Sequence, residues 1–242
     1  MRDKNLIKKS LYWYLRKWLV DGGFVVKITG ETLSQESSKI YNAAHDDWVF
    51  EDLTNYPVKV YDNGNEVNLS NYSRNFLRGK ITFSDSYSIQ GTITTDYGYL
   101  QVNLRQSYPE DAEFQYINLP LLVIGIAGSP MVSLRLGGDK RLIHDCQIDI
   151  FARSDDEKDE LQNLIEDKLR DNPNFEEIDF NQGFPLTENG EINSNYTEPI
   201  KKYLNVKEVD SRPILVTKPT KKERYRILIT FNLFELRYRE FS

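Results

Sequence analysis

The sequence predicts an α+β fold: a mixed, mainly antiparallel sheet packed by two helices, with an inserted β-hairpin module and an extended arm. Three observations lead to this fold class. Two segments repeat apolar residues at helical spacing, several segments alternate apolar and polar residues as strands do, and one long stretch shows neither period. The 242 residues suffice for one large domain or for a domain with an insertion.

The first predicted helix covers residues 4–20. Its apolar side chains recur at helical spacing and are Ile7, Leu11, Tyr14, Leu15, Trp18 and Leu19. The basic residues on the remaining surface are Lys8, Lys9, Arg16 and Lys17. Such a basic amphipathic helix suits either a membrane surface or a sheet, and packing on a sheet is favoured. Asp21-Gly22-Gly23 ends the helix, since glycine tolerates the left-handed conformation that closes many helices.

Residues 55–110 predict a β-rich insertion, which leaves 1–54 and 111–242 as an α/β core. The stretch PVKVYDNGNEVNL reads as strand, turn, strand, because Asn63 and Gly64 both accept positive φ. The stretches GKITFSDS and QGTITTDYGYLQVNL continue the alternation of apolar and polar residues. These patterns indicate an antiparallel sheet inside the insertion.

The stretch RLIHDCQIDIFARSDDEKDELQNLIEDKLRD, residues 141–171, changes from strand to helix periodicity. On the predicted strand, His144, Cys146, Ile148 and Ile150 share one face, opposite Asp145, Gln147, Asp149 and Phe151. Ser154 and Glu157 form a capping box that begins the helix. The core face of this helix consists of Leu161, Leu164, Ile165 and Leu169.

Three further strands and an arm complete the prediction. A buried strand is expected within 116–130, a short strand within 131–138 and a long strand within 224–240. On this last strand, Tyr225, Ile227, Ile229, Phe231 and Leu233 face one way, opposite Arg224, Arg226, Thr230 and Asn232. Residues 172–222 contain five prolines and no clear period, which is typical of a functional arm or a mobile loop.

His144, Asp145, Cys146 and Asp149 resemble a metal or nucleophile cluster in sequence. Strand geometry argues against both, because His144 and Cys146 point away from the two aspartates. Residues two apart on a strand are about 6–7 Å apart, too far for the contact that a Cys-His nucleophile needs. We therefore interpret Cys146 as a small core residue and expect His144 at the edge of the strand.

Two other acidic groups allow a metal site and also a simpler interpretation. Asp155, Asp156 and Glu157 could bind a cation, but helix capping and the helix dipole explain all three positions. His45-Asp46-Asp47 lacks a second histidine nearby, and GIAGSP and LGGDKR match no phosphate-binding fingerprint. We expect no catalytic residues, no cofactor and no metal, and a chain that is not an enzyme.

Composition limits the partners. The net charge of −6 argues against a protein that wraps nucleic acid, which needs a basic face. The single cysteine excludes an internal disulfide and any zinc site built from cysteines. No apolar run approaches the roughly 20 residues of a spanning helix, and the N-terminus lacks the apolar region of a secretory signal. The sequence predicts an intracellular product with no membrane partner.

The order of elements resembles tail terminator and tail-completion proteins from the necks of tailed bacteriophages. In that family, a strand of the form I-x-I-[FY]-A precedes a polar turn and a helix with x-L-x-x-x-I-x-x-x-L. The matching residues are Ile148, Ile150, Phe151 and Ala152 in the strand and Leu161, Ile165 and Leu169 in the helix. The stretch VKVYDNG…GKITFSDSYSIQGTITTDYGYLQV is similar to β-hairpin modules of phage virion proteins. The likeness covers the C-terminal half well and the first 30 residues loosely. The β-rich insertion at 55–110 and the arm at 172–222 make the chain longer than compact family members.

The resemblance implies a hexameric homo-oligomeric ring that terminates the tail and joins it to the head. Implied partners are a neck adaptor or head-completion protein, tail-tube and sheath proteins, and DNA that passes through the lumen without sequence-specific binding. Localisation would be the virion, after assembly in the host cytoplasm.

Two alternatives stay open. One is another virion part, such as a head-tail adaptor, a tail-tube protein or a baseplate component. The other is a metal-dependent nuclease that uses Asp145, Asp149 and the acidic residues 155–157.

Overall fold

The computed structural model describes residues 2–129, 131–133, 140–214 and 222–237. It confirms the α+β class, with mostly antiparallel pairing between strands. The chain divides into two compact units. Unit 1 comprises Met1–Trp18, Val102–Asn181 and Glu198–Ser242, and unit 2 comprises Leu19–Gln101 and Gln182–Thr197.

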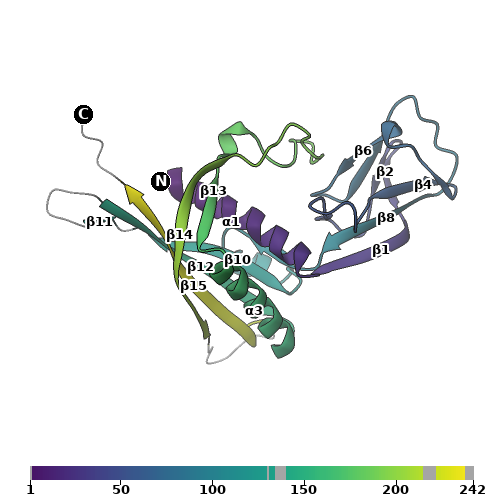
Figure 1. Ribbon diagram of the computed structural model, residues 1–242. Helices are drawn as coiled ribbons and strands as arrows, with labels where there is room; N and C mark the ends of the chain where they lie inside the picture. Colours follow the sequence, from purple (N-terminus) through teal and green to yellow (C-terminus); the bar gives the residue numbers. More distant parts are fainter. Residues whose placement is uncertain (1, 130, 134–139, 215–221, 238–242) are drawn as a thin grey trace. The chain divides into compact units, whose positions relative to one another are not determined.

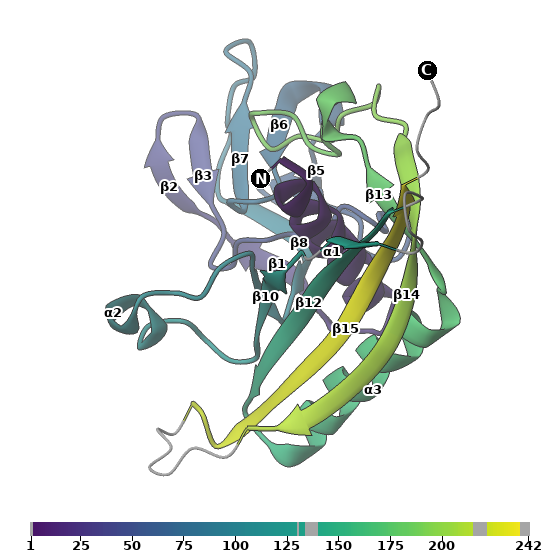
Figure 2. The same ribbon diagram turned by 90° about the vertical axis from the view of Figure 1, so that its left-hand side faces the viewer.

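Unit 1 is built on a seven-stranded sheet with the order β13-β14-β15-β12-β10-β9, in which β11 pairs with β12. The strands are β9 (Asn103–Arg105), β10 (Leu121–Gly128), β11 (Met131–Ser133), β12 (Lys140–Ala152), β13 (Asn174–Ile178), β14 (Ile200–Pro213) and β15 (Tyr225–Arg237). All pairs are antiparallel except β9 with β10. Strands β12, β15 and β14 form its long centre (Figure 2).

Two helices cover one face of this sheet, α1 (Arg2–Asp21) and α3 (Asp155–Asp171). Alternate residues of a strand point to the same face of the sheet. On the face beneath the helices, most of these residues are apolar. Register places Cys146 opposite Phe231 and Ile148 opposite Ile229, and all four side chains are buried. The fully buried helix residues Leu11 and Leu161 complete this core.

Helix α3 begins at the predicted cap. The Ser154 side chain accepts a hydrogen bond from the Glu157 N–H at 3.2 Å. The Glu157 carboxylate accepts from the Arg153 N–H at 2.7 Å, one residue before the usual capping-box partner. On the core face, Leu161, Ile165 and Leu169 are buried, whereas Leu164 is half-buried.

The opposite face of the sheet is covered in part by the segment between β9 and β10, which contains the short helix α2 (Asp111–Phe114). Ile117 and Phe114 pack against Leu121, Val123 and Phe151. We call residues 106–119 the α2 loop. Figure 2 shows it leaving the sheet after β9 and returning at the start of β10.

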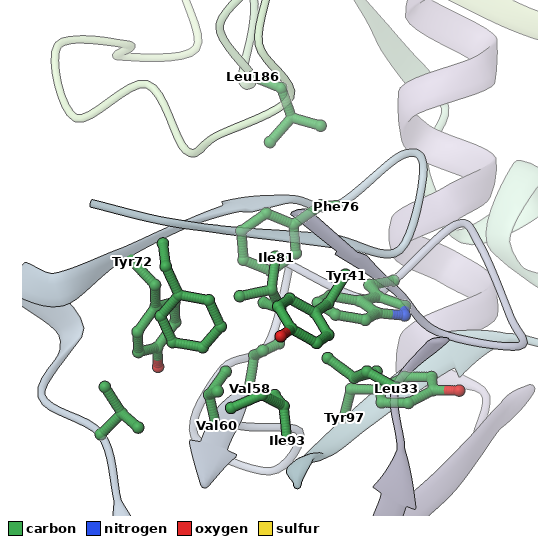
Figure 3. Close-up of a cluster of buried hydrophobic side chains, with 13 residues drawn as sticks. Leu33, Tyr41, Val58, Val60, Tyr72, Phe76, Ile81, Ile93, Tyr97 and Leu186 are labelled. Atoms are coloured by element: carbon green, nitrogen blue, oxygen red, sulfur yellow. The ribbon is translucent and has the colours of Figure 1, made fainter. Parts of the chain in front are cut away.

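Unit 2 contains two four-stranded sheets with the orders β1-β8-β4-β5 and β2-β3-β7-β6. The strands are β1 (Val25–Thr32), β2 (Ser34–Ser37), β3 (Ile40–Asn42), β4 (Lys59–Asp62), β5 (Asn65–Glu66), β6 (Tyr72–Asn75), β7 (Lys80–Phe83) and β8 (Ile93–Leu100). The predicted turn lies between β4 and β5, with positive φ at Asn63 (51°) and Gly64 (80°). Both sheets contribute to a cluster that includes Trp48, Phe76 and Tyr97 (Figure 3).

The boundary of the β-rich part differs from the predicted 55–110. Strand β1 pairs with β8 from Val25↔Leu100 onward, which draws the region from residue 19 into unit 2. Strand β9 pairs in parallel with β10 instead, so residues 102–110 belong to unit 1. Both boundaries depend on pairing between strands that are distant in the sequence, and local periodicity does not reveal which strands pair.

The predicted arm, 172–222, is largely structured. Its ends form β13, the 3₁₀ helix η2 (Phe180–Gln182) and β14 of the central sheet. Its middle belongs to unit 2, where Leu186 packs into the core cluster and the Gly190 carbonyl accepts from the Phe76 N–H at 3.0 Å (Figure 3). Residues 215–221 of the arm, 134–138 of the predicted strand 131–138 and 238–240 of the last strand lie outside the described residues.

Candidate functional site

The four candidate residues of β12 point to opposite faces of the sheet. His144 and Cys146 lie on the helix-covered face, and both are almost completely buried. Burial, followed by the charge of Asp145, raises the pKa of the Cys146 thiol, which suppresses the reactive thiolate. The aspartates lie on the other face, so the four side chains form no common site.

Asp149 is fully buried and belongs to a network of three side chains. Its carboxylate accepts hydrogen bonds from the Arg226 Nε at 2.9 Å and from the Tyr108 hydroxyl at 2.6 Å. The guanidinium of Arg226 also lies 4.7 Å from the ring centroid of Phe151. Burial and the bond to Asp149 raise the pKa of Tyr108, so the phenol stays a donor. The network fastens the start of the α2 loop to β12 and β15.

His144 is not at the edge of its strand, contrary to expectation. It is 1% exposed, and its Nδ1 lies 2.9 Å from the Ser129 hydroxyl. Its Nε2 lies 3.9 Å from Glu235, whose carboxylate accepts from Lys202 Nζ at 2.7 Å. Lys202 in turn lies 3.3 Å from Glu177. These side chains link β12, β15, β14 and β13 across the sheet, so the buried histidine has a structural role.

Two of the three acidic residues at the start of α3 have local partners. Glu157 caps α3 and pairs with Arg153, while Asp155 pairs with Lys158. The ring of His45 stacks on Tyr99, with centroids 4.0 Å apart. Across the described residues, no group of three or more His, Cys, Asp or Glu side chains is arranged to hold a metal ion.

The central sheet leaves part of each edge without a neighbouring strand among the residues described. At one edge, β13 pairs only with Ile200–Asn205, and β14 continues to Pro213. That continuation has a bulge between Lys207 and Asp210, with φ of 57° at Glu208. Bulges, charges and proline are the devices by which natural edges resist pairing.

The other edge has a different chemistry. Strand β9 pairs with Leu121–Val123, and Ile124 is fully buried, whereas Gly125–Gly128 of β10 is at least partly exposed and has no strand on that side within the described ranges. This stretch is free of charged residues, and its irregularity comes only between Ile126 and Gly128. An uncharged open edge can accept a further strand, because its main-chain groups lack partners.

The α2 loop packs at the start of β10, against Leu121 and Val123, and further contacts hold it in place. Lys222 Nζ donates to the carbonyls of Phe114, Gln115 and Ile117 at 2.7, 2.7 and 2.6 Å. Tyr116, between these anchored residues, is 85% exposed. The loop carries three carboxylates and no basic residue. An aromatic ring held out on an ordered acidic loop is a suitable anchor for another surface.

Charge is divided unevenly between the units. Unit 2 contains 6 Lys and Arg against 13 Asp and Glu, whereas unit 1 contains 25 against 24. The acidic excess of the chain therefore lies in unit 2. Unit 1 is nearly neutral, so the exposed carboxylates of the α2 loop are a local feature and do not reflect the average charge of the unit.

Sequence reasoning missed the open edge and the α2 loop. The stretch YPEDAEFQY contains acidic and aromatic residues, but nothing local shows that Tyr116 stays exposed while Ile117 is buried and Phe114 is partly buried. The anchoring lysine is more than 100 residues away. The only local signal was the break in periodicity before the buried strand.

Comparisons with known proteins do not add a family: no family model matches the sequence, and no curated protein is significantly similar to it. None of the described helices is long and apolar enough to cross a membrane.

Proposed function

We propose that the chain is a structural virion protein of a tailed bacteriophage, which forms a homo-oligomeric ring in the neck, terminates the tail and joins it to the head. The observation that carries the proposal is the open β10 edge of unit 1 together with the acidic, aromatic α2 loop that leads into β10. Surfaces of this kind serve binding between chains. The resemblance of residues 148–169 to tail terminators supplies the phage context.

The two edges of the central sheet differ, which favours a ring. A contact between two different surfaces of identical subunits is heterologous, and it closes into a ring when the rotation per subunit divides a full turn. The β10 edge is uncharged, whereas the β14 edge is bulged and charged. A self-complementary dimer would need one surface that pairs with itself, and a ring needs two surfaces that differ.

The charge distribution agrees with a channel for DNA. Phosphates are held by clustered Lys and Arg. Unit 2 has about twice as many acidic as basic residues, and unit 1 is balanced. DNA would therefore pass such a ring without strong or sequence-specific binding. A neck adaptor, tail-tube protein and sheath protein are the partners we expect on its two ends.

Mass photometry of the purified full-length chain, followed by negative-stain imaging, tests the proposal. We expect a closed ring, with six subunits as the reference stoichiometry, and no hydrolytic activity. A monomer at every concentration, also after addition of tail-tube protein, would refute it. A ring that binds baseplate proteins instead of tail-tube ends would place the chain elsewhere in the virion.

A further inference from the structure

Unit 2 has a groove of about 540 Å³ between the β4–β5 hairpin and the segment formed by the 3₁₀ helix η1 (Leu69–Asn71) and β6. Its floor is apolar and includes Val58, Val67 and Tyr72, which are also part of the core cluster. Leu69 lines it and is 52% exposed. A groove of this size accommodates a few side chains of a bound peptide.

Two of the three charged residues that line the groove are basic, in a unit with an excess of acidic residues. Lys59 and Arg74, two of the six basic residues of unit 2, line it. Lys59 is partly neutralised by Glu66 at 3.6 Å. Arg74 lies 5.2 Å from the ring centroid of Phe76 and has no carboxylate within ion-pair distance among the described residues. A planar guanidinium held on a ring and lacking an acidic partner suits a carboxylate.

The chain itself carries a segment with matching chemistry. The α2 loop presents Tyr116, the most exposed of the large hydrophobic side chains described, beside three carboxylates. Glu113 lies 3.2 Å from Arg105, whereas Glu110 and Asp111 are exposed without an ion pair among the residues described. An aromatic anchor fits the apolar floor, and a free carboxylate fits the Arg74 rim.

From this match we infer that the α2 loop of one copy docks into the unit 2 groove of the next copy, with Tyr116 against Leu69 and Tyr72 and the carboxylates of Glu110 and Asp111 toward Arg74. The inference rests on the proposed ring and names its subunit contact. Loop and groove are different surfaces, so the contact is heterologous, as a ring requires. The cation-lined groove also gives the contact its direction, since opposite charges orient encounters.

Photo-crosslinking tests the contact. Tyr116 is replaced by p-benzoyl-phenylalanine in the full-length chain, and equal amounts of ¹⁴N- and ¹⁵N-labelled protein are mixed before irradiation. We expect mixed-isotope peptide pairs that join position 116 to residues 57–74. Pairs with one isotope only would mean that the loop contacts its own chain, and would overturn the inference.

Charge reversal provides an independent measurement. Arg74→Glu and Asp111→Arg should each weaken subunit association by about tenfold, as removal of an interfacial ion pair does, and the double variant should recover most of that loss. Arg78→Glu is the matched control, because Arg78 is an exposed arginine of the same unit that does not line the groove. Equal effects of Arg74→Glu and Arg78→Glu, without rescue, would overturn the inference.

The outcomes separate the inference from the proposed function. A ring that persists in all variants and crosslinks position 116 elsewhere keeps the ring and rejects this contact. A crosslink to a tail-tube or adaptor protein instead would assign the α2 loop to a different partner and also reject it. A chain that never assembles refutes the ring, and with it this contact.

Discussion

Asp149→Asn removes one charge from the buried network that joins β12, β15 and the α2 loop. The amide has the shape of the carboxylate and can still accept from the Tyr108 hydroxyl, which lies 2.6 Å away. What changes is the partner of Arg226, whose guanidinium donates to both carboxylate oxygens. In the variant, the Arg226 cation faces a neutral amide at a position that is fully buried in the wild type.

The expected loss follows from burial. Removing one partner of a buried ion pair costs about 3–5 kcal/mol, and a single hydrogen bond to a charged group contributes about 1.5–3 kcal/mol. The Arg226 side chain is 21% exposed, so water screens part of the unpaired charge. The asparagine also keeps one acceptor. We therefore expect a loss of about 2–3 kcal/mol in the free energy of unfolding of unit 1.

Hydrogen–deuterium exchange in increasing urea measures this loss in peptides from β12 and β15, apart from unit 2. Asp145→Asn is the matched control: it lies on the same strand and face, is not fully buried and has no ion pair among the described contacts, so a change below about 0.5 kcal/mol is expected. Equal stability of the two variants would refute the structural assignment of Asp149. Loss of a metal-dependent nuclease activity at unchanged stability would favour the enzyme alternative.

Three further predictions concern other parts of the chain. The Cys146 thiol, whose pKa is raised by burial, should react with iodoacetamide at pH 8 only when unit 1 opens, so labelling should follow urea unfolding; rapid labelling of native protein would contradict its placement. Burial raises the pKa of Glu166, but hydrogen bonds from Ser211 and Gln162 and the charge of Arg170 bring it below the ordinary 4.5. The ionised Glu166 therefore contributes fully to the free energy of unfolding above pH 4.5, and this contribution is lost as the pH falls through the lower pKa of the folded state. Urea unfolding should show that Glu166→Gln and the wild type differ in stability at pH 7 and become equally stable in acid. Gly79→Ala should destabilise unit 2 by about 2–4 kcal/mol and leave exchange in β12 and β15 unchanged, because φ is +58° and the added Cβ would lie 2.2 Å from the His45 carbonyl oxygen.

Short-range patterns predicted the local elements well. The alternation of β12 and β15, the cap at Ser154 and the Asn63-Gly64 turn all depend on residues within a few positions of one another. Local chemistry determines them, since strand faces, capping and turn conformation need no distant partner. Leu164 shows the limit: its spacing fits the core face, but the packing surface covers Leu161 and Ile165 more deeply.

Long-range features were beyond the same reasoning. The boundary at residue 19 depends on pairing between Val25 and Leu100, and the structured arm depends on Leu186 entering a core made by distant strands. Asp149 looked like a candidate catalytic acid because its partner, Arg226, is 77 residues away. A sequence pattern reports the face of a side chain, but it does not report which residue of another strand meets it.

The buried polar groups and the exposed apolar ones point to the same conclusion about where function lies. Asp149, Glu177 and His144 are buried, yet each has an ionisable partner on another strand, so pairing offsets the cost of their burial and gives them a structural role. Tyr116 is the reverse case: an aromatic side chain is kept 85% exposed although three hydrogen bonds from Lys222 order the loop around it. Holding an apolar ring in water brings no advantage to an isolated chain, because burial would stabilise it. In the proposed ring, the unit 2 groove of a neighbouring copy would cover Tyr116, at a fixed ratio of one groove per loop.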